Sequence, residues 1–137
     1  MDWKLEVVVV PVADVDRAKQ FYADKVGFHV DHDTRVSDEI HVVQLTPPGS
    51  ACSIVLGKGI VEMAPGSIKG LQLVVSDIHA ARAFLVERGV EASDVQVYDS
   101  GSFRPSREGD VLNNVAFVYF SDPDGNGWAV QQISSRG

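Results

Sequence analysis

The fold is decided by the stretch LEVVVVPVADVDRAKQFY, residues 5–22. Its first part, residues 5–12, is apolar and rich in β-branched side chains, which is typical of a buried strand. Asp14 stands where a helix N-cap is expected, and the apolar residues after it recur at the spacing of one helix face. We therefore predict a strand that leads directly into an amphipathic helix, which ends at Gly27.

The same pattern occurs a second time along the chain. Shifting the sequence by 63 positions superimposes Asp14 on Asp77 and Phe21 on Phe84. A second strand over residues 71–75 and a second helix capped by Asp77 are predicted from this repeat. Because Phe21 and Phe84 each belong to the apolar stripe of their helix, we expect both rings to be buried.

Each predicted helix is followed by short β-rich runs separated by turn residues. The predicted strands cover residues 28–33, 39–46, 51–56, 95–99, 115–120 and 128–133. Residues 58–67 are the expected linker between a first module of about residues 1–57 and a second of about residues 68–137. Two βαβββ modules predict a single α+β domain, in which eight strands form one curved mixed sheet with a concave ligand pocket. Residues 100–114 are predicted to be a polar loop that only the second module has.

The composition fits a small globular protein and excludes several partners. The 137 residues are 45% hydrophobic and 23% charged, which is enough for one domain with its own core. The net charge of −7, with no cluster of basic residues, repels phosphate backbones, so nucleic acid is not expected as a partner. No apolar run is long enough to span a bilayer, and no secretory signal is recognisable. With a single cysteine, Cys52, these features predict a cytoplasmic protein without a membrane partner.

Both ends of the chain resemble the vicinal oxygen chelate superfamily, which includes glyoxalases, bleomycin resistance proteins and extradiol dioxygenases. The resemblance rests on residues 5–22 with Gly27-Phe28 after them, and on FSDPDGNGW at residues 120–128. It covers nearly the whole chain. It implies the βαβββ fold, a cavity for a small-molecule ligand, and a homodimer.

The resemblance also implies positions for a divalent metal, which the superfamily holds with His and Glu side chains on the first and last strands of each module. The corresponding residues here are Val7, Ser53, Gly70 and Ala129. None of them offers an imidazole or a carboxylate. We therefore predict no standard metal site and no cofactor.

Two other groups of residues are candidates for a metal. His29, Asp31 and His41 have the same parity on neighbouring predicted strands, so they form the fallback site; three polar side chains on an exposed sheet face are the alternative. Residues 122–127, DPDGNG, match the first half of a calcium-binding EF-hand loop. Ile133 stands where that loop needs a bidentate Glu, and the flanks are predicted strands, so turn chemistry explains this segment better.

Strand alternation sends one set of side chains to the face opposite the helices, where they are expected to line the pocket. This set is Val7, Val9, Ser53, Val55, Gln72, Val74, Ala129 and Gln131. It is apolar with a few amides and one hydroxyl, which suits an organic molecule. Phe103 and Arg104, in the predicted loop, are expected to act as a lid over the ligand; a solvated loop is the alternative.

Two functions are compatible with these residues. The first is a metal-independent binding protein of the bleomycin-resistance type, which sequesters a hydrophobic or aromatic small molecule such as an antibiotic. The second is an enzyme of the same fold, a lyase, isomerase or dioxygenase-like protein, acting on a carbonyl-containing or polyketide-like metabolite through Gln72, Gln131, His41 or an arginine of the lid. The sequence marks no acid–base pair, which favours binding, but whether the protein is an enzyme stays open.

Overall fold

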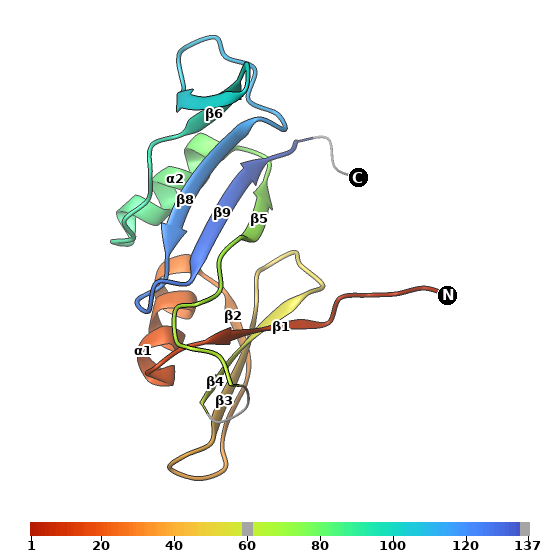
Figure 1. Ribbon diagram of the computed structural model, residues 1–137, viewed down its shortest axis with the longest axis vertical. Helices are drawn as coiled ribbons and strands as arrows, with labels where there is room; N and C mark the ends of the chain where they lie inside the picture. The colour runs from red at the N-terminus through yellow and green to blue at the C-terminus, as the bar shows by residue number, and fades with distance from the viewer. Residues whose placement is uncertain (59–61, 135–137) are drawn as a thin grey trace. The chain divides into compact units, whose positions relative to one another are not determined.

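The computed structural model describes residues 1–58 and 62–134, which form two compact units (Figure 1). Unit 1 comprises Met1–Ile68 with Asp122–Asn126, and unit 2 comprises Lys69–Ser121 with the residues from Gly127 onward. Of the linker predicted at residues 58–67, residues 59–61 lie outside the described residues, and the others belong to unit 1. No helix in these described parts is long and apolar enough to cross a membrane.

Unit 1 is a four-stranded sheet with one helical segment packed on one face. Its elements are β1 (Val7–Pro11), α1 (Val15–Gln20), η1 (Phe21–Val26), β2 (His29–Arg35), β3 (His41–Thr46) and β4 (Ser53–Lys58). The strand order is β1-β4-β3-β2, in which β1 runs parallel to β4 and the other pairs are antiparallel. The core lies between the sheet and the helical segment, where Val10, Leu56 and Tyr22 are fully buried.

The helical segment of unit 1 begins and ends where the sequence predicts. The Asp14 carboxylate accepts a hydrogen bond of 3.0 Å from the backbone N–H of Arg17, and Gly27 ends the segment in the left-handed conformation, with φ 89°. The second half, η1, is a π-helix, whose wider turn the sequence pattern does not predict. Phe21 is buried, as predicted, with 8% of its surface exposed.

Unit 2 is a five-stranded sheet with one helix on one face. Its elements are β5 (Leu71–Val75), α2 (Ile78–Glu87), β6 (Gln96–Asp99), β7 (Ser102–Pro105), β8 (Ala116–Ser121) and β9 (Gly127–Gln132). The strand order is β5-β9-β8-β6-β7, in which β5 runs parallel to β9 and the other pairs are antiparallel. Helix α2 packs against β8 and β9, and Ile78, Val118 and Val130 are buried in this unit.

The α+β class is confirmed, but the strand count and the single sheet are not: the described residues form nine strands in two sheets. The additional strand, β7, lies inside residues 100–114, for which the sequence predicts a loop. Ser100 and Gly101 adopt positive φ angles of 54° and 92°, as the central residues of a two-residue hairpin turn do. This turn allows β7 to pair with β6, so the predicted loop begins with a β-hairpin.

The predicted burial of Phe84 is wrong, because 39% of its surface is exposed. Ile78 and Leu85, seven residues apart and therefore on one side of α2, are the helix residues that face the core. Phe84 precedes Leu85 and is rotated by roughly 100° around the helix from it, toward solvent. Its ring contacts the Arg88 guanidinium, whose carbon lies 3.6 Å from the ring centroid.

Candidate functional site

One face of the sheet in unit 2 carries no helix, and we call it the open face of unit 2. Strand pairing places Gln72 and Tyr119 on either side of Ala129, and Val74 and Phe117 on either side of Gln131. Because paired residues share a face, all six side chains lie on the open face. Four of the predicted ligand-binding residues therefore lie together here: Gln72, Val74, Ala129 and Gln131.

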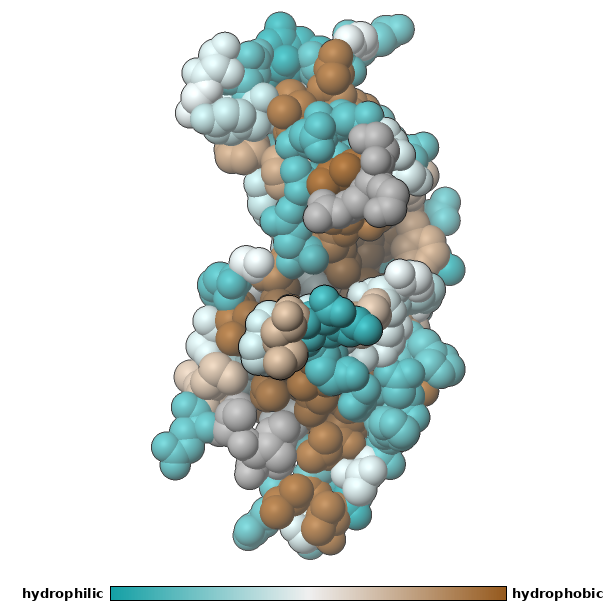
Figure 2. Space-filling model, turned by 90° about the vertical axis from the view of Figure 1, so that its right-hand side faces the viewer, coloured by the Kyte–Doolittle hydropathy of each residue, from teal (hydrophilic) through white to brown (hydrophobic). Residues whose placement is uncertain are grey.

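Aromatic rings make up a large part of this open face. Phe103, on β7, lies with its ring centroid 5.3 Å from that of Tyr98, 5.7 Å from that of Phe117 and 6.4 Å from that of Tyr119. The Phe117 and Tyr119 rings stack at 6.2 Å. We call Tyr98, Phe103, Phe117 and Tyr119 the ring cluster. Three of its members, Tyr98, Phe103 and Tyr119, are each between 39% and 49% exposed, so the cluster offers apolar surface to a ligand. Figure 2, which shows the side of the molecule that lies to the right in Figure 1, has hydrophobic surface between hydrophilic side chains.

Phe103 was the only member of the ring cluster among the predicted site residues. The signal for Phe117 and Tyr119 was present in the sequence, since the two alternate with the buried Ala116, Val118 and Phe120 along one strand. Burial raises the pKa of the Tyr119 hydroxyl. The phenol is therefore a hydrogen-bond donor over the whole physiological pH range.

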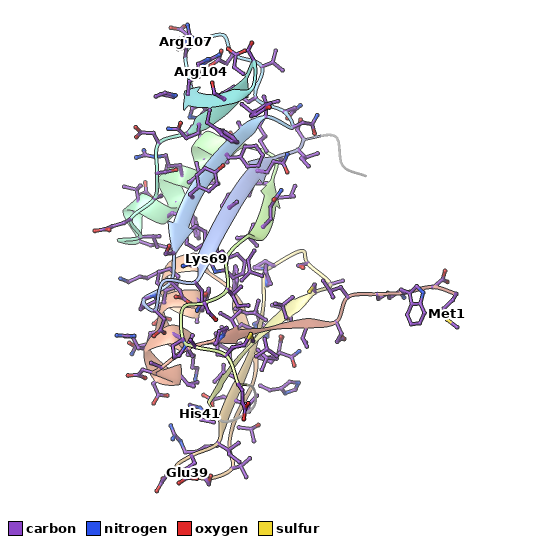
Figure 3. The ribbon with its side chains drawn as sticks, in the orientation of Figure 1. Met1, Glu39, His41, Lys69, Arg104 and Arg107 are labelled. Atoms are coloured by element: carbon purple, nitrogen blue, oxygen red, sulfur yellow. The ribbon has the colours of Figure 1, made fainter. Side chains whose placement is uncertain are left out.

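Arg104, which the sequence places in a lid, is engaged in ion pairs within unit 2. Its Nε donates to Asp99 at 3.0 Å, and its two terminal nitrogens donate to the two oxygens of Asp110 at 2.9 Å each. Asp110 also accepts a bond of 2.6 Å from the backbone N–H of Arg107. Arg104 thus fixes the loop that follows β7 to the hairpin that carries Phe103. Arg104 and Arg107 are labelled in Figure 3.

These ion pairs predict a pH dependence. Hydrogen bonds from Arg104 hold the pKa of Asp110 and of Asp99 below the usual range, with further help from the Arg107 backbone N–H and from Ser100, respectively. Both folded-state pKa values lie below the unfolded value of about 3.9, so the two ionised carboxylates stabilise the fold. This contribution to stability is present above about pH 4 and is lost as the pH falls through the lowered values. Arg104→Gln is expected to raise the pKa of the Asp110 carboxyl, measured by NMR titration.

Arg107→Gln is the matched control for this titration. Arg107 contributes its backbone N–H, which the substitution keeps, whereas its side-chain charge is the weakest cause of the lowered pKa of Asp110. The control variant should therefore titrate like the wild type. Equal titration of Asp110 in wild type and Arg104→Gln would refute the assigned role of Arg104.

In unit 1, the sheet face opposite the helical segment carries the other predicted strand residues. Val7 pairs with Ser53 and Val9 pairs with Val55, so the four side chains are neighbours. The Ser53 hydroxyl lies 2.6 Å from the Thr46 hydroxyl, which in turn hydrogen-bonds the Asp31 carboxylate. The face is a mixture of half-buried valines and one polar network.

The fallback metal site, His29 with Asp31 and His41, is not assembled. The β2–β3 register shifts between Val30 and His32, a bulge that reverses the parity predicted for the strand. His41 is 4% exposed on the helix side, with its Nε2 2.7 Å from Asp33 and its Nδ1 3.2 Å from Arg35. His29 is exposed and lies 3.8 Å from Asp31. Among the residues that the structure describes, no three His, Cys, Asp or Glu side chains are arranged to hold a metal.

Residues 122–126 form a structural turn of unit 1, as turn chemistry predicts, in place of half a calcium loop. The Asp122 carboxylate, 5% exposed, accepts bonds from the Tyr22 hydroxyl at 2.7 Å and the Asn126 side chain at 2.8 Å. Its other oxygen accepts the backbone N–H groups of Asp124 and Asn126, at 2.9 Å each. The Asn126 amide also donates to the Pro11 carbonyl at 2.8 Å. Protein donors thus occupy both carboxylate oxygens of Asp122.

A separate pocket of about 280 Å³ lies beside α2. It is lined by His79, Arg82, Asp94, Val95, Pro105 and Ser106. Arg82 is tied there by a 2.8 Å bond from its Nε to the Ser93 carbonyl. None of the predicted ligand-binding residues lines this pocket, so it is distinct from the open face of unit 2.

Comparison with known proteins identifies the class to which this fold belongs. Residues 4–130 match the model of the Glyoxalase/Bleomycin resistance protein/Dioxygenase superfamily. The chain belongs to this superfamily, which confirms the resemblance seen in the sequence. A comparison with curated proteins gives no significant match.

Several solved structures are similar to this chain over nearly its whole length. TnmS3, an antibiotic binding protein from Streptomyces sp. CB03234, is 32% identical, with 97% of this chain and 98% of that chain covered and a TM-score of 0.74. A glyoxalase/bleomycin resistance protein from the same organism is 33% identical, with 94% and 100% covered and a TM-score of 0.71. A superfamily member from Sphaerobacter thermophilus DSM 20745 is 26% identical, with 96% and 98% covered and a TM-score of 0.74.

The residues present do not fit the divalent metal of the superfamily. Val7 and Ala129 are apolar, and Gly70, just before β5 with φ 86°, has no side chain. The Ser53 hydroxyl is hydrogen-bonded to Thr46. A cation needs ligands that replace its water shell, and these four positions do not supply them.

Proposed function

We propose that this protein binds a hydrophobic or aromatic small molecule on the open face of unit 2, without a metal ion, and releases it unchanged. The observation that carries the proposal is the ring cluster, Tyr98, Phe103, Phe117 and Tyr119, in which Tyr119 is the cross-strand neighbour of the short side chain of Ala129. A flat ligand can stack on these rings while the alanine methyl leaves room for it.

The comparisons support the same proposal. TnmS3, which is described as an antibiotic binding protein, is similar to this chain over 97% of its length at 32% identity. We propose by this likeness that the natural ligand is an antibiotic or a related metabolite. A cytoplasmic location, association as a homodimer, and a concave pocket lined by residues of both modules remain further proposals from the sequence.

The open face favours binding over the alternative, an enzyme acting on a carbonyl-containing or polyketide-like metabolite. The polar groups at its named positions are the amides of Gln72 and Gln131 and the phenols of Tyr98 and Tyr119. Amides do not ionise near neutral pH, and general acid–base catalysis needs groups that gain and lose a proton. A thermal-shift screen with aromatic antibiotics, followed by mass spectrometry of the bound compound, tests the choice, because a binding protein returns the compound at its original mass.

Phe103→Ala tests the role of the ring cluster. The substitution should weaken binding of the best compound from the screen by about 1–3 kcal/mol, the transfer free energy of one large apolar side chain. The matched control is Phe84→Ala, which removes another partly exposed ring, from α2 on the covered side of the same sheet. Calorimetric titration should give a larger dissociation constant for Phe103→Ala than for wild type, and an unchanged one for Phe84→Ala. Equal constants for wild type and Phe103→Ala would remove the ring cluster from the site.

A further inference from the structure

A short chain of amides lies beside the ring cluster on the open face of unit 2. Gln72 donates from Nε2 to Oε1 of Gln131 at 2.5 Å, and Gln131 donates from its own Nε2 to the backbone carbonyl of Asn114 at 2.9 Å. The chain is anchored at one end on the backbone, which fixes the orientation of both amides. Its other end is the Gln72 side chain, which is exposed.

This amide chain keeps unused hydrogen-bonding capacity. Each amide nitrogen has two hydrogens and uses one of them, and no residue in the described part of the chain donates to the Gln72 oxygen. The hydroxyls of Tyr98 and Tyr119 likewise have no hydrogen-bond partner among the described residues. The open face therefore combines apolar rings with donors and an acceptor that water satisfies until a ligand replaces it.

The strand register places these polar groups around a single small side chain. Gln72 and Tyr119 are the two direct cross-strand neighbours of Ala129. Cross-strand neighbours lie about 5 Å apart, so roughly 10 Å separates the Cβ atoms of Gln72 and Tyr119. An aromatic ring lying over Ala129 spans that interval, and a substituent on its edge comes within hydrogen-bond distance of the amide or the phenol. The residues named on this face carry no charge, which favours a neutral substituent over an ionised one.

We propose that the open face of unit 2 selects flat aromatic molecules that carry a neutral oxygen on the ring, a phenol or a ring carbonyl, and that Gln72 and Gln131 determine this selectivity. The inference rests on the proposed function, since it names the class of molecule that the same face binds. The ring cluster supplies affinity for the aromatic surface. The amide chain discriminates among aromatic molecules of the same shape. Any of these ligands displaces water from the amides, and only a ligand with the oxygen replaces the lost hydrogen bonds.

The test uses two probes of equal size, 2-naphthol and 2-methylnaphthalene, which differ in a hydroxyl in place of a methyl group. Equilibrium dialysis of the full chain against each probe gives the two dissociation constants. Wild type should bind 2-naphthol about five- to tenfold more tightly, the effect of one neutral hydrogen bond. In Gln72→Met/Gln131→Met, which keeps the side-chain length but removes the amides, the two probes should bind equally, because 2-naphthol loses its hydrogen bond and 2-methylnaphthalene no longer desolvates an amide.

Each outcome decides a different point. Equal binding of the two probes by wild type would overturn the selectivity and leave the proposed function standing, whereas no binding of either probe would overturn both. A preference that persists in the double variant would overturn the assignment to Gln72 and Gln131. Gln20→Met, at an exposed position on α1, is the control and should keep the wild-type ratio. If circular dichroism shows the double variant unfolded, Gln72→Met alone should lower the ratio at least twofold, and an unchanged ratio would count against the proposal.

Discussion

Replacing Asp122 by alanine is expected to destabilise the protein by about 3–5 kcal/mol, the cost of breaking a buried polar network around a charge. The carboxylate is 5% exposed and accepts four hydrogen bonds. Its loss leaves the Tyr22 hydroxyl, the Asn126 amide and two backbone N–H groups without that acceptor in a region that water does not reach. The turn at residues 122–126 should lose its order together with the packing around it.

Chemical denaturation followed by circular dichroism measures this effect. Tyr22→Phe removes one of the four donors and should cost about 1 kcal/mol. Asp94→Ala is the control, because the Asp94 side chain is 76% exposed and its substitution should change stability by less than about 0.5 kcal/mol. If Asp122→Ala were as stable as Asp94→Ala, the network around Asp122 would not hold the turn as described.

Phe21→Ala should destabilise the protein by about 3–5 kcal/mol, as the loss of a core aromatic ring usually does. Phe21 is 8% exposed, and its ring packs edge to face against Tyr22 with centroids 5.2 Å apart. The cavity left by the ring lies between the helical segment and the sheet of unit 1, where close packing limits how far neighbours can relax.

Phe84→Ala provides the comparison, because the repeat pairs Phe84 with Phe21 while the structure leaves it 39% exposed. Its removal deletes the contact with Arg88 and should cost about 1 kcal/mol. Thermal denaturation of the two variants should therefore give a much larger fall in melting temperature for Phe21→Ala. Equal falls would mean that both rings are core residues and that the exposed position of Phe84 is wrong.

Local chemistry allowed the sequence to predict the helix starts and the strand faces. Asp14 and Asp77 each accept a bond from the backbone N–H three residues later, as N-caps do. Period-two alternation also placed Gln72 and Gln131 on the same face, because alternation depends only on the strand being regular. These predictions needed no knowledge of distant parts of the chain.

The failures have causes that lie outside the local pattern. The bulge at Asp31 reverses the parity of the rest of β2, so a metal site based on shared parity with His41 could not be right. Phe84 is exposed because Ile78 and Leu85 are the residues of α2 that face the core, and the apolar stripe alone does not report which of its residues do so. The Ser100-Gly101 turn was present in the sequence, but within a polar stretch it was indistinguishable from a loop.

The turn at residues 122–126 bears on whether the chain can be divided. This pentapeptide belongs to unit 1, although the chain before and after it belongs to unit 2. A fragment ending at Ile68 would lack the acceptor for the Tyr22 hydroxyl and the amide that binds the Pro11 carbonyl. The backbone N–H of Ile68 itself donates to Asn126 at 3.1 Å. A single cut between the two repeats therefore does not yield two autonomous halves, and synthesis must reach the last turn before the first half can complete its core.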